Sequence, residues 1–187
     1  MSLILASQSP RRRELLGLLK FPFQIRVADI DETMDSTKLP FQEVSRISSL
    51  KALAVERKEG DIVIAADTIV VCDDRVLGKP RSAEEAKQML TMLSGRGHQV
   101  MTGMTVLRGD KMLCHTEVTD VFFRPLSEKE IDAYVAGGDP MDKAGSYGIQ
   151  SGAAIFVQRI EGDYYNVVGL PVCRLQQMLM QVAPELF

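Results

Sequence analysis

Apolar and polar positions along this chain recur with two different periods, which predict strands and helices in turn. A short apolar run at residues 3–6 predicts the first strand, and alternation over residues 23–28 predicts a second. A set of apolar residues then recurs at helical spacing and predicts a helix: Phe41, Val44, Ile47, Leu50 and Ala54. The continuous apolar run at residues 61–67 is typical of a strand that is buried on both faces. The N-terminal third therefore predicts strand, helix, strand, helix and strand in that order.

The middle of the chain predicts hairpins and capped helices. Strand patterns pair around short turns at residues 69–72 with 75–77, and at residues 99–107 with 112–123. Ser82 with Glu85, and Ser127 with Glu130, have the spacing of a capping box. A helix is therefore expected after each of these two serines.

The C-terminal part predicts one more hairpin and a last helix. Residues 153–160 and 164–168 resemble two strands around a turn, and a helix begins near Pro171 with one apolar face: Leu175, Met178, Leu179 and Val182. No linker or internal repeat interrupts the alternation of patterns. We expect an α/β fold with a mixed sheet in a single domain over residues 1–187, with two lobes around a central cleft as a possible arrangement.

Composition and charge exclude several classes of protein. The net charge of −3 argues against a protein that coats nucleic acid. The three cysteines are far apart, and there are only two histidines, which argues against disulfides, structural zinc and a histidine-rich metal site. No apolar stretch approaches the roughly 20 residues of a membrane span, and no signal peptide is recognisable. We expect a soluble protein of the reducing cytoplasm.

Three consecutive arginines, Arg11 to Arg13, lie where the first helix is expected to begin. Ser9 suits the helix cap and Pro10 the first helical position. Each cation at a helix N-terminus costs roughly 0.3–1 kcal/mol, whereas the free backbone amides there bind phosphate. From the residues alone, the arginines either lie on a solvated helix face or form part of a polyphosphate site.

Other polar side chains are candidates for chemistry, and each also has a plainer explanation. Asp67 ends the predicted buried strand, where α/β sheets often bind ligands, but Asp67-Thr68 equally suits a turn. Lys51 borders an apolar stripe and can reach solvent along it or point at a ligand. Lys79 lies in a Gly-Lys-Pro loop that suits the surface. The acidic residues at 29–35 suit either solvent or a hard divalent cation.

Residues 142–152 form a polar segment interrupted by three glycines. The glycines allow the backbone to approach a ligand closely, and the amide of Gln150 can both donate and accept hydrogen bonds. Functional residues often lie on such loops. A purely structural loop explains the same pattern.

Five short motifs occur in order along the chain: LASQSPRR at 5–12, ADTIV at 66–70, GKP at 78–80, LSG at 93–95 with His98, and DKAGSYGIQ at 142–150. Together they resemble the Maf family of nucleotide pyrophosphatases over most of the chain. The resemblance implies hydrolysis of a nucleoside triphosphate between its α and β phosphorus atoms, with a divalent cation (Mg, Mn or Co). It also implies a mixed-sheet fold similar to the inosine triphosphate pyrophosphatases, usually as a homodimer.

The same resemblance implies a role for particular residues. Asp67 would accept the proton of the attacking water and would hold the metal together with Glu32. The phosphate contacts would come from Ser7, Arg12, Lys51 and Lys79. Substrate choice would depend on Arg11, Thr68 and Gln150, which match the subgroup for dTTP and UTP, whereas the subgroup resembling 7-methyl-GTP hydrolases carries Trp, Gln and Glu there. Arg13 is expected to face solvent.

Two positions depart from the family pattern. Ser151 stands where glycine commonly follows the glutamine, and residues 48–50 are Ser-Ser-Leu where charged or small helical residues are more typical. Neither position is a presumed catalytic group. The departures therefore put the fine geometry of the loop and helix in doubt and leave the implied reaction unchanged.

The sequence thus predicts an enzyme that removes dTTP, UTP or modified relatives from the nucleotide pool. Polyphosphate hydrolysis requires mainly positioning and cations that neutralise the phosphate oxygens, and arginines and lysines at helix and loop ends supply both. The alternatives are a related pyrophosphatase with another substrate such as 7-methyl-GTP, a non-catalytic regulator of division, and a nucleic-acid-binding module. The net acidity and the lack of aromatic residues near the arginines argue against the last.

Overall fold

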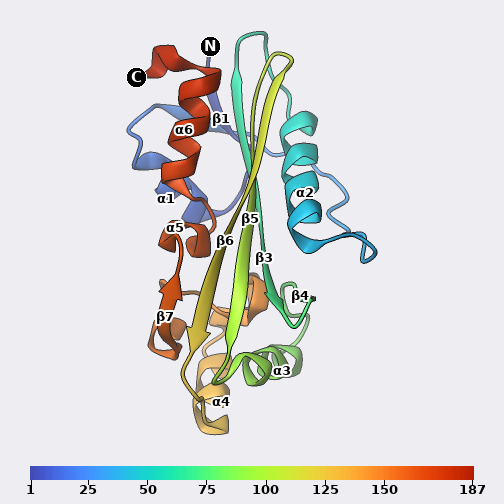
Figure 1. Ribbon diagram of the computed structural model, residues 1–187, viewed down its shortest axis with the longest axis vertical. Coiled ribbons are helices and arrows are strands. Elements are labelled where there is room, and N and C mark those ends of the chain that lie inside the picture. Colours follow the sequence, from blue (N-terminus) through green and yellow to red (C-terminus); the bar gives the residue numbers. More distant parts are fainter. The chain divides into compact units, whose positions relative to one another are not determined.

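The apolar run at the N-terminus forms β1 (Leu3–Leu5), which pairs in parallel with β2 (Phe23–Ile25) and with β3 (Ile62–Cys72). In the computed structural model, which describes residues 1–187, the seven strands have the order β2-β1-β3-β5-β6-β7, with β4 paired to β3 (Figure 1). The pairs β3–β4 and β6–β7 are antiparallel. The sheet is therefore mixed, which confirms the predicted fold class.

Most of the other elements also lie where the patterns place them. In chain order they are α1 (Pro10–Gly17), α2 (Pro40–Ala54), β4 (Arg75–Leu77), α3 (Ala83–Leu93), β5 (Gly97–Arg108), β6 (Lys111–Phe123), α4 (Glu128–Ala136), β7 (Val157–Glu161), α5 (Tyr164–Val168) and α6 (Val172–Val182). Short 3-10 helices cover Asp139–Asp142, Ala144–Ser146, Gly152–Phe156 and Pro184–Leu186. None of the helices combines the length and apolar character that would span a bilayer.

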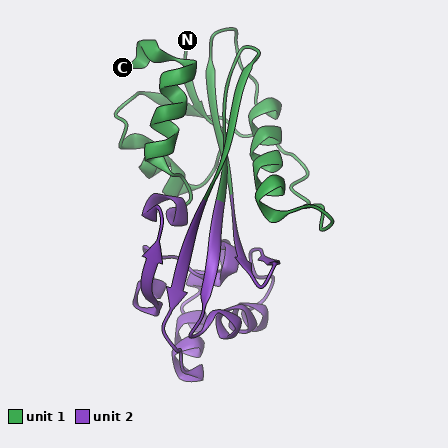
Figure 2. Cartoon of the chain, in the orientation of Figure 1, with its two compact units in different colours: residues 1–67, 102–117, 169–187 green, residues 68–101, 118–168 purple.

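The chain divides into two compact units, shown in Figure 2. Unit 1 contains residues 1–67, 102–117 and 169–187, and unit 2 contains residues 68–101 and 118–168. Because β3, β5 and β6 each contribute to both units, each unit is assembled from separate stretches of sequence.

In unit 1, α2 lies on one side of the strands, and α1 and α6 lie on the other (Figure 1). A buried apolar cluster links α2 to the strands: Ile4, Ala6, Ala52, Val55, Val63, Ala65 and Leu107. Gly103 of β5 allows this approach, since a Cβ there would lie 2.4 Å from the backbone oxygen of Val44 in α2. The apolar face predicted for α6 is buried in full.

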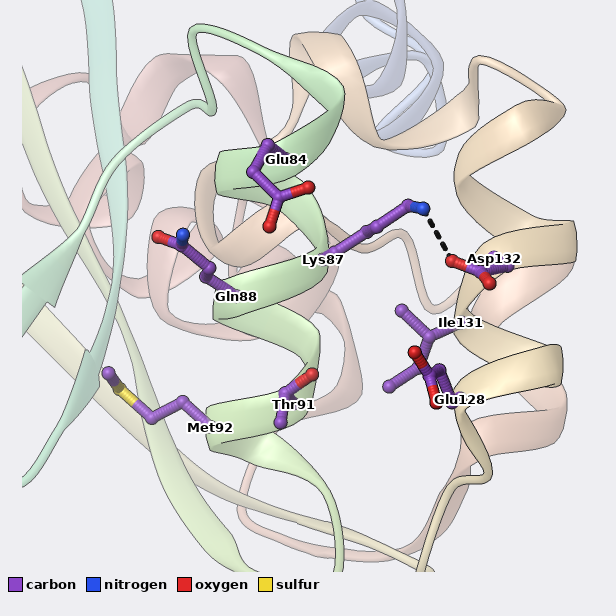
Figure 3. Close-up of a pocket in the computed structure, with 8 residues that line it drawn as sticks. All are labelled: Glu84, Lys87, Gln88, Thr91, Met92, Glu128, Ile131 and Asp132. Atoms are coloured by element: carbon purple, nitrogen blue, oxygen red, sulfur yellow. Dashed lines mark ion pairs between the residues drawn. The ribbon is translucent and has the colours of Figure 1, made fainter.

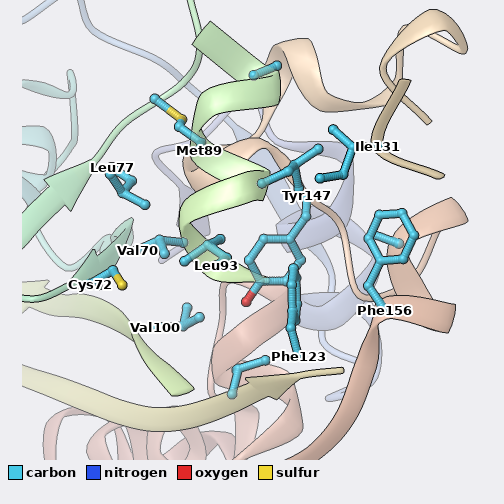
Figure 4. Packing of buried hydrophobic residues seen from close by; sticks show 14 of the residues in the cluster. Val70, Cys72, Leu77, Met89, Leu93, Val100, Phe123, Ile131, Tyr147 and Phe156 are labelled. Carbon is cyan, nitrogen blue, oxygen red and sulfur yellow. The ribbon is translucent and has the colours of Figure 1, made fainter. Parts of the chain in front are cut away.

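Unit 2 has its own apolar core (Figure 4). It is built from β3, β5, β6, α3, α4 and the segment after α4, and includes Val70, Leu90, Leu93, Val121, Phe123, Tyr147 and Phe156. At the start of α4, Ser127 and Glu130 form the reciprocal capping box that the sequence predicts. The tight hairpin is also confirmed, and its turn residues Asp73 and Asp74 both have positive φ, 48° and 59°.

The cap of α3 differs from the prediction in one detail. Ser82 accepts the hydrogen bond from the backbone N–H of Glu85, as expected. The Glu85 carboxylate, however, accepts from the N–H of Arg81 and not from that of Ser82. The helix is therefore capped by half of a capping box.

Two strands end at other residues than predicted, because the strands that pair with them set their length. β2 ends at Ile25 and not at residue 28, since β1 is its only partner and ends at Leu5. β3 continues through Asp67 to Cys72, because its second half pairs with β4. Asp67 therefore lies in the middle of a strand and does not end it, contrary to the prediction.

The hairpin predicted at residues 153–168 is wrong on both sides of its turn. Residues 153–156 belong to a 3-10 helix, and only Val157–Glu161 form a strand. Tyr164–Val168 is a helix, α5, because the Asp163 carboxylate accepts the N–H of Tyr165 at 2.7 Å and starts a helical turn. Asn166 of that turn donates its side-chain amide to the Val100 carbonyl, which fixes α5 against β5.

The buried face of α2 is also only partly as predicted. Val44 and Ile47 are buried, whereas Phe41 and Leu50 are 45% and 37% exposed. Glu43 is buried instead, at 2% exposed. The apolar periodicity located the helix correctly, while its orientation buries a carboxylate.

Candidate active site

The turn between β1 and α1 is held by two serine hydroxyls. Ser9 Oγ accepts the N–H of Arg12 and caps α1, and Pro10 is the first helical residue, as predicted. Ser7 Oγ accepts the N–H of Ser9 at 3.2 Å and a guanidinium N–H of Arg12 at 3.3 Å. The buried Ser7 therefore fixes the turn and the Arg12 side chain together.

Arg12 extends from this turn into a charged cluster of unit 1. Its Nε donates to the carbonyl of Gly169 at 2.9 Å. Burial lowers the pKa of the Arg12 guanidinium; the nearby carboxylate of Asp67 raises that pKa, the neighbouring charge of Arg11 lowers it, and Glu32 raises it. Arg12 thus lies within electrostatic reach of both carboxylates that the family resemblance assigns to the site.

Lys51 connects those two carboxylates directly. Its Nζ donates to Glu32 Oε2 at 2.8 Å and to Asp67 Oδ1 at 2.7 Å, and the side chains of Lys51 and Asp67 are each only 14% exposed. The sequence left two positions open for Lys51, along the apolar stripe or toward a ligand. In the structure, the Lys51 side chain extends from α2 and contacts both acids. Glu32 lies on the segment before α2, and Asp67 lies on β3.

These residues meet the requirements of a divalent cation only in part. No group of three or more acidic, histidine or cysteine side chains gathers to hold a metal ion. Glu32 and Asp67 nevertheless present oxygens to one shared ammonium group. Mg²⁺ is commonly held by one or two carboxylates and completed by water and substrate phosphates. The pair therefore fits a cation that binds together with a triphosphate.

Of the other predicted site residues, Arg11 is half-buried in α1 of unit 1, whereas Thr68, Lys79 and Gln150 belong to unit 2. Thr68 follows Asp67 in β3, so the two side chains point to opposite faces of the strand. Lys79 and Gln150 are exposed, Lys79 between β4 and α3 and Gln150 in the loop before the 3-10 helix at Gly152–Phe156. Their functional roles remain predictions.

The loop that carries Gln150 is anchored at both ends. Ser151, one of the departures from the family pattern, donates its hydroxyl to Asp139 at 2.6 Å, and Tyr134 donates to the same carboxylate at 2.6 Å. Below the loop, the hydroxyl of Tyr147 lies 2.8 Å from His98 Nε2 in the core. Gln150 is therefore exposed on a well-fixed segment.

Sequence reasoning missed two residues of α2 that contact the segment carrying Glu32. Glu43 and Arg46 form an ion pair with a closest N–O distance of 2.7 Å. The available signal was a glutamate one helical turn before an arginine, inside an otherwise apolar stretch. That spacing alone does not distinguish a buried pair from a solvated one.

An open groove lies between α3 and α4 of unit 2 (Figure 3). Its walls carry both charges and apolar groups, and Lys87 and Asp132 pair across it. None of the predicted site residues lines this groove. The charged cluster of unit 1 is therefore the better candidate for the site of chemistry.

A family model described as "Maf-like protein" matches residues 2–182. The chain belongs to this family. This Maf-like protein is 51% identical over 179 residues to a Bacillus cytotoxicus protein named dTTP/UTP pyrophosphatase, a match that covers 95% of the chain and 94% of that relative. It is also 51% identical over 180 residues to the protein of the same name from Bacillus cereus, covering 96% and 94%.

The fold of this Maf-like protein also occurs in a distant solved structure. The HAM1 protein of Coxiella burnetii matches it with a TM-score of 0.53 at 16% identity, covering 97% of this chain and 99% of that one. This likeness confirms the predicted mixed-sheet α/β fold.

Proposed function

We propose that this Maf-like protein is a nucleoside triphosphate pyrophosphatase that hydrolyses dTTP and UTP to the monophosphate and pyrophosphate. The observation that carries the proposal is the 51% identity, over nearly the whole chain, to relatives named dTTP/UTP pyrophosphatase. The cluster of Ser7, Arg12, Lys51 and Asp67 supports it, because a triphosphate needs cations and hydrogen-bond donors fixed in place.

Arg12 and Lys51 would bind the phosphates. Arg12 is held by Ser7 and by the Gly169 carbonyl, so little side-chain freedom remains to be lost when an anion binds. The N-terminus of α1 adds the positive end of the helix dipole. The Lys51 ammonium group has a third N–H beyond the two that it donates to Glu32 and Asp67, and this N–H would donate to a phosphate oxygen. Lys79 would supply a further cation.

Asp67 would act as the general base. A water oxygen attacks the α-phosphorus, its proton passes to the Asp67 carboxylate, and the bond from the α-phosphorus to the bridging oxygen breaks, releasing pyrophosphate. The hydrogen bond from Lys51 fixes one Asp67 oxygen and leaves the other for water. Glu32 and Asp67 would also hold a divalent cation (Mg, Mn or Co), which would neutralise charge on the phosphate oxygens.

Choice of base would depend on Arg11, Thr68 and Gln150. The Gln150 amide can match a pyrimidine edge through its N–H and its carbonyl, and its loop is fixed by Ser151 and Tyr147. We also propose a cytoplasmic location, since all three cysteines are free thiols and two of them are exposed. Homodimerisation, which the family resemblance implies, is tested by the mass in solution from light scattering.

The first test is a substrate panel. The protein is incubated with dTTP, UTP, CTP and 7-methyl-GTP in the presence of Mg²⁺ or Mn²⁺, and the products are separated by ion-exchange chromatography. We expect monophosphate and pyrophosphate from dTTP and UTP at much higher rates than from the other two. Formation of diphosphate and orthophosphate would contradict cleavage between the α and β phosphorus atoms.

The assigned base is tested by Asp67→Asn. We expect kcat to fall by about 10²-fold or more, because general-base catalysis contributes roughly 10²–10⁴ in rate. Asp29→Asn is the matched control, since Asp29 is an exposed residue of the acidic stretch that also carries Glu32, and no role is assigned to it. Thermal melting checks that both variants fold, and full activity of folded Asp67→Asn would refute the assignment.

A further inference from the structure

Glu32 lies on a segment whose backbone is not held by regular structure. Between β2 and α2, residues 26–39 form neither helix nor strand. Glu32 itself is 57% exposed, and its only ion pair is with Lys51. Its position beside Asp67 therefore depends on whatever fixes this segment.

Glu43 contacts the segment from α2. It is only 2% exposed, and its Oε2 accepts the backbone N–H of Asp35 at 2.8 Å. Arg46, one turn further along α2, donates from Nε and Nη2 to the two Glu43 oxygens at 2.9 and 2.7 Å. This two-pronged pairing fixes the orientation of both side chains.

Arg46 contacts the segment a second time. The same Nη2 donates to the carbonyl of Thr33 at 2.9 Å. The pair thus holds one backbone group on each side of Met34, and Thr33 directly follows Glu32. A buried ion pair is often no more stabilising than apolar residues of the same volume. The effect that the structure does show for Glu43 and Arg46 is that they hold the backbone of residues 33–35 beside the site.

We propose that Glu43 and Arg46 are positioning residues, which hold residues 33–35 so that the Glu32 carboxylate stays beside Lys51 and Asp67. The inference rests on the proposed function in one respect, that Glu32 helps to bind a divalent cation together with the triphosphate. Neither Glu43 nor Arg46 is required to touch the substrate.

Arg46→Lys is the test variant. It keeps the positive charge beside Glu43, but one ammonium group cannot reproduce the fork that spans both Glu43 oxygens and the Thr33 carbonyl. Lys38→Ala is the matched control, because the half-exposed Lys38 ammonium lies 3.8 Å from Asp35 and 4.0 Å from Glu43. Its backbone N–H, which donates to the Asp35 carbonyl, is kept by alanine. Thermal melting confirms that each variant folds.

Two measurements separate positioning from catalysis. Hydrogen exchange of the peptide over residues 30–37 reports the hold on the segment directly, and it should be faster in Arg46→Lys than in wild type or Lys38→Ala. Binding of Mn²⁺ by electron paramagnetic resonance, with the non-hydrolysable α,β-methylene analogue of UTP, should weaken by about 10-fold or more, the range typical of groups that orient metal ligands.

A double-mutant cycle with Glu32→Gln identifies the route of the effect. If Arg46 acts through Glu32, the Mn²⁺ affinity of Arg46→Lys/Glu32→Gln equals that of Glu32→Gln alone. Additive losses, or an Arg46→Lys variant with the affinity and exchange rate of Lys38→Ala, would overturn the inference. If wild type hydrolyses no triphosphate, the proposed function fails, while faster exchange in Arg46→Lys still supports the hold on the segment.

Discussion

Arg12 and Arg13 are neighbours in the first turn of α1 but lie in different surroundings. Arg12 is partly buried and donates to Ser7 and to the Gly169 carbonyl, whereas Arg13 is exposed to solvent, as predicted. The helix N-terminus acts on both cations in the same way. Comparing the activity lost on removing Arg12 with that lost on removing Arg13 therefore measures the effect of a fixed guanidinium near the two carboxylates.

This pair gives a prediction with a built-in control. Arg12→Ala should lower kcat/KM for UTP by about 10–100-fold, because a charged hydrogen bond contributes roughly 1.5–3 kcal/mol. Arg13→Ala should leave kcat/KM unchanged within about twofold and should not lower thermal stability. Steady-state kinetics of both variants check this, and equal losses in the two would show that α1 supplies only general positive charge.

The packing of α2 on β5 depends on a missing side chain. At Gly103 a Cβ would meet backbone atoms of Val44 and Ser45 at 2.4–2.7 Å, and backbone cannot move aside as a flexible side chain can. This contact sets the distance between α2 and the strands. Since α2 carries Lys51 as well as Glu43 and Arg46, it also affects where these side chains lie. The position of the site thus depends on a residue that takes no part in its chemistry.

Gly103→Ala should therefore destabilise the protein. We expect a loss of at least about 1–3 kcal/mol in the free energy of unfolding, the usual cost of overpacking, measured by urea denaturation. Gly17→Ala is the control, since Gly17 lies in α1 with no atom within 4 Å of its added Cβ. Its stability should be unchanged or slightly higher. A tolerated Gly103→Ala would mean that α2 can shift on the strands at little cost.

The stability of the whole chain toward acid depends on groups in both units. Burial lowers the pKa of His98 to about 4 from 6.5. The Arg46 side chain, followed by the Asp35 N–H, lowers the pKa of Glu43 to about 2 from 4.5. In each case the unfolded chain binds the proton at a higher pH than the folded chain does. The free energy of unfolding therefore decreases as the pH is lowered. The contribution of His98 to stability is lost between pH 6.5 and 4, and that of Glu43 between pH 4.5 and 2.

The His98 window can be measured separately. His98→Gln keeps a side chain able to hydrogen-bond to Tyr147 but cannot titrate. The stability advantage of wild type over the variant should shrink as the pH falls from about 7.5 to about 4.5, by an amount on the order of 3 kcal/mol at most. Urea denaturation at several pH values gives this difference. A difference independent of pH would show that the buried ring does not stay neutral.

Local patterns located most of the elements because they depend on near neighbours. The capping box of Ser127 and Glu130 and the apolar face of α6 are properties of consecutive residues, and both occur as predicted. The errors fall where a contact from outside the segment decides its conformation. β3 runs through Asp67 because β4 pairs with its second half, and Tyr164–Val168 is a helix although its pattern suits a strand.

The sequence alone was sufficient for the α/β class and for the family, because periodicity and ordered motifs survive without coordinates. It could not place Lys51 between Glu32 and Asp67, since Lys51 is 19 positions from Glu32 and 16 from Asp67, and the three meet only when α2 packs beside β3. Nor could it show that Glu43 is buried and paired with Arg46. Whether a charge faces solvent or a partner depends on which surfaces the folded chain brings together, and that is a property of the tertiary structure.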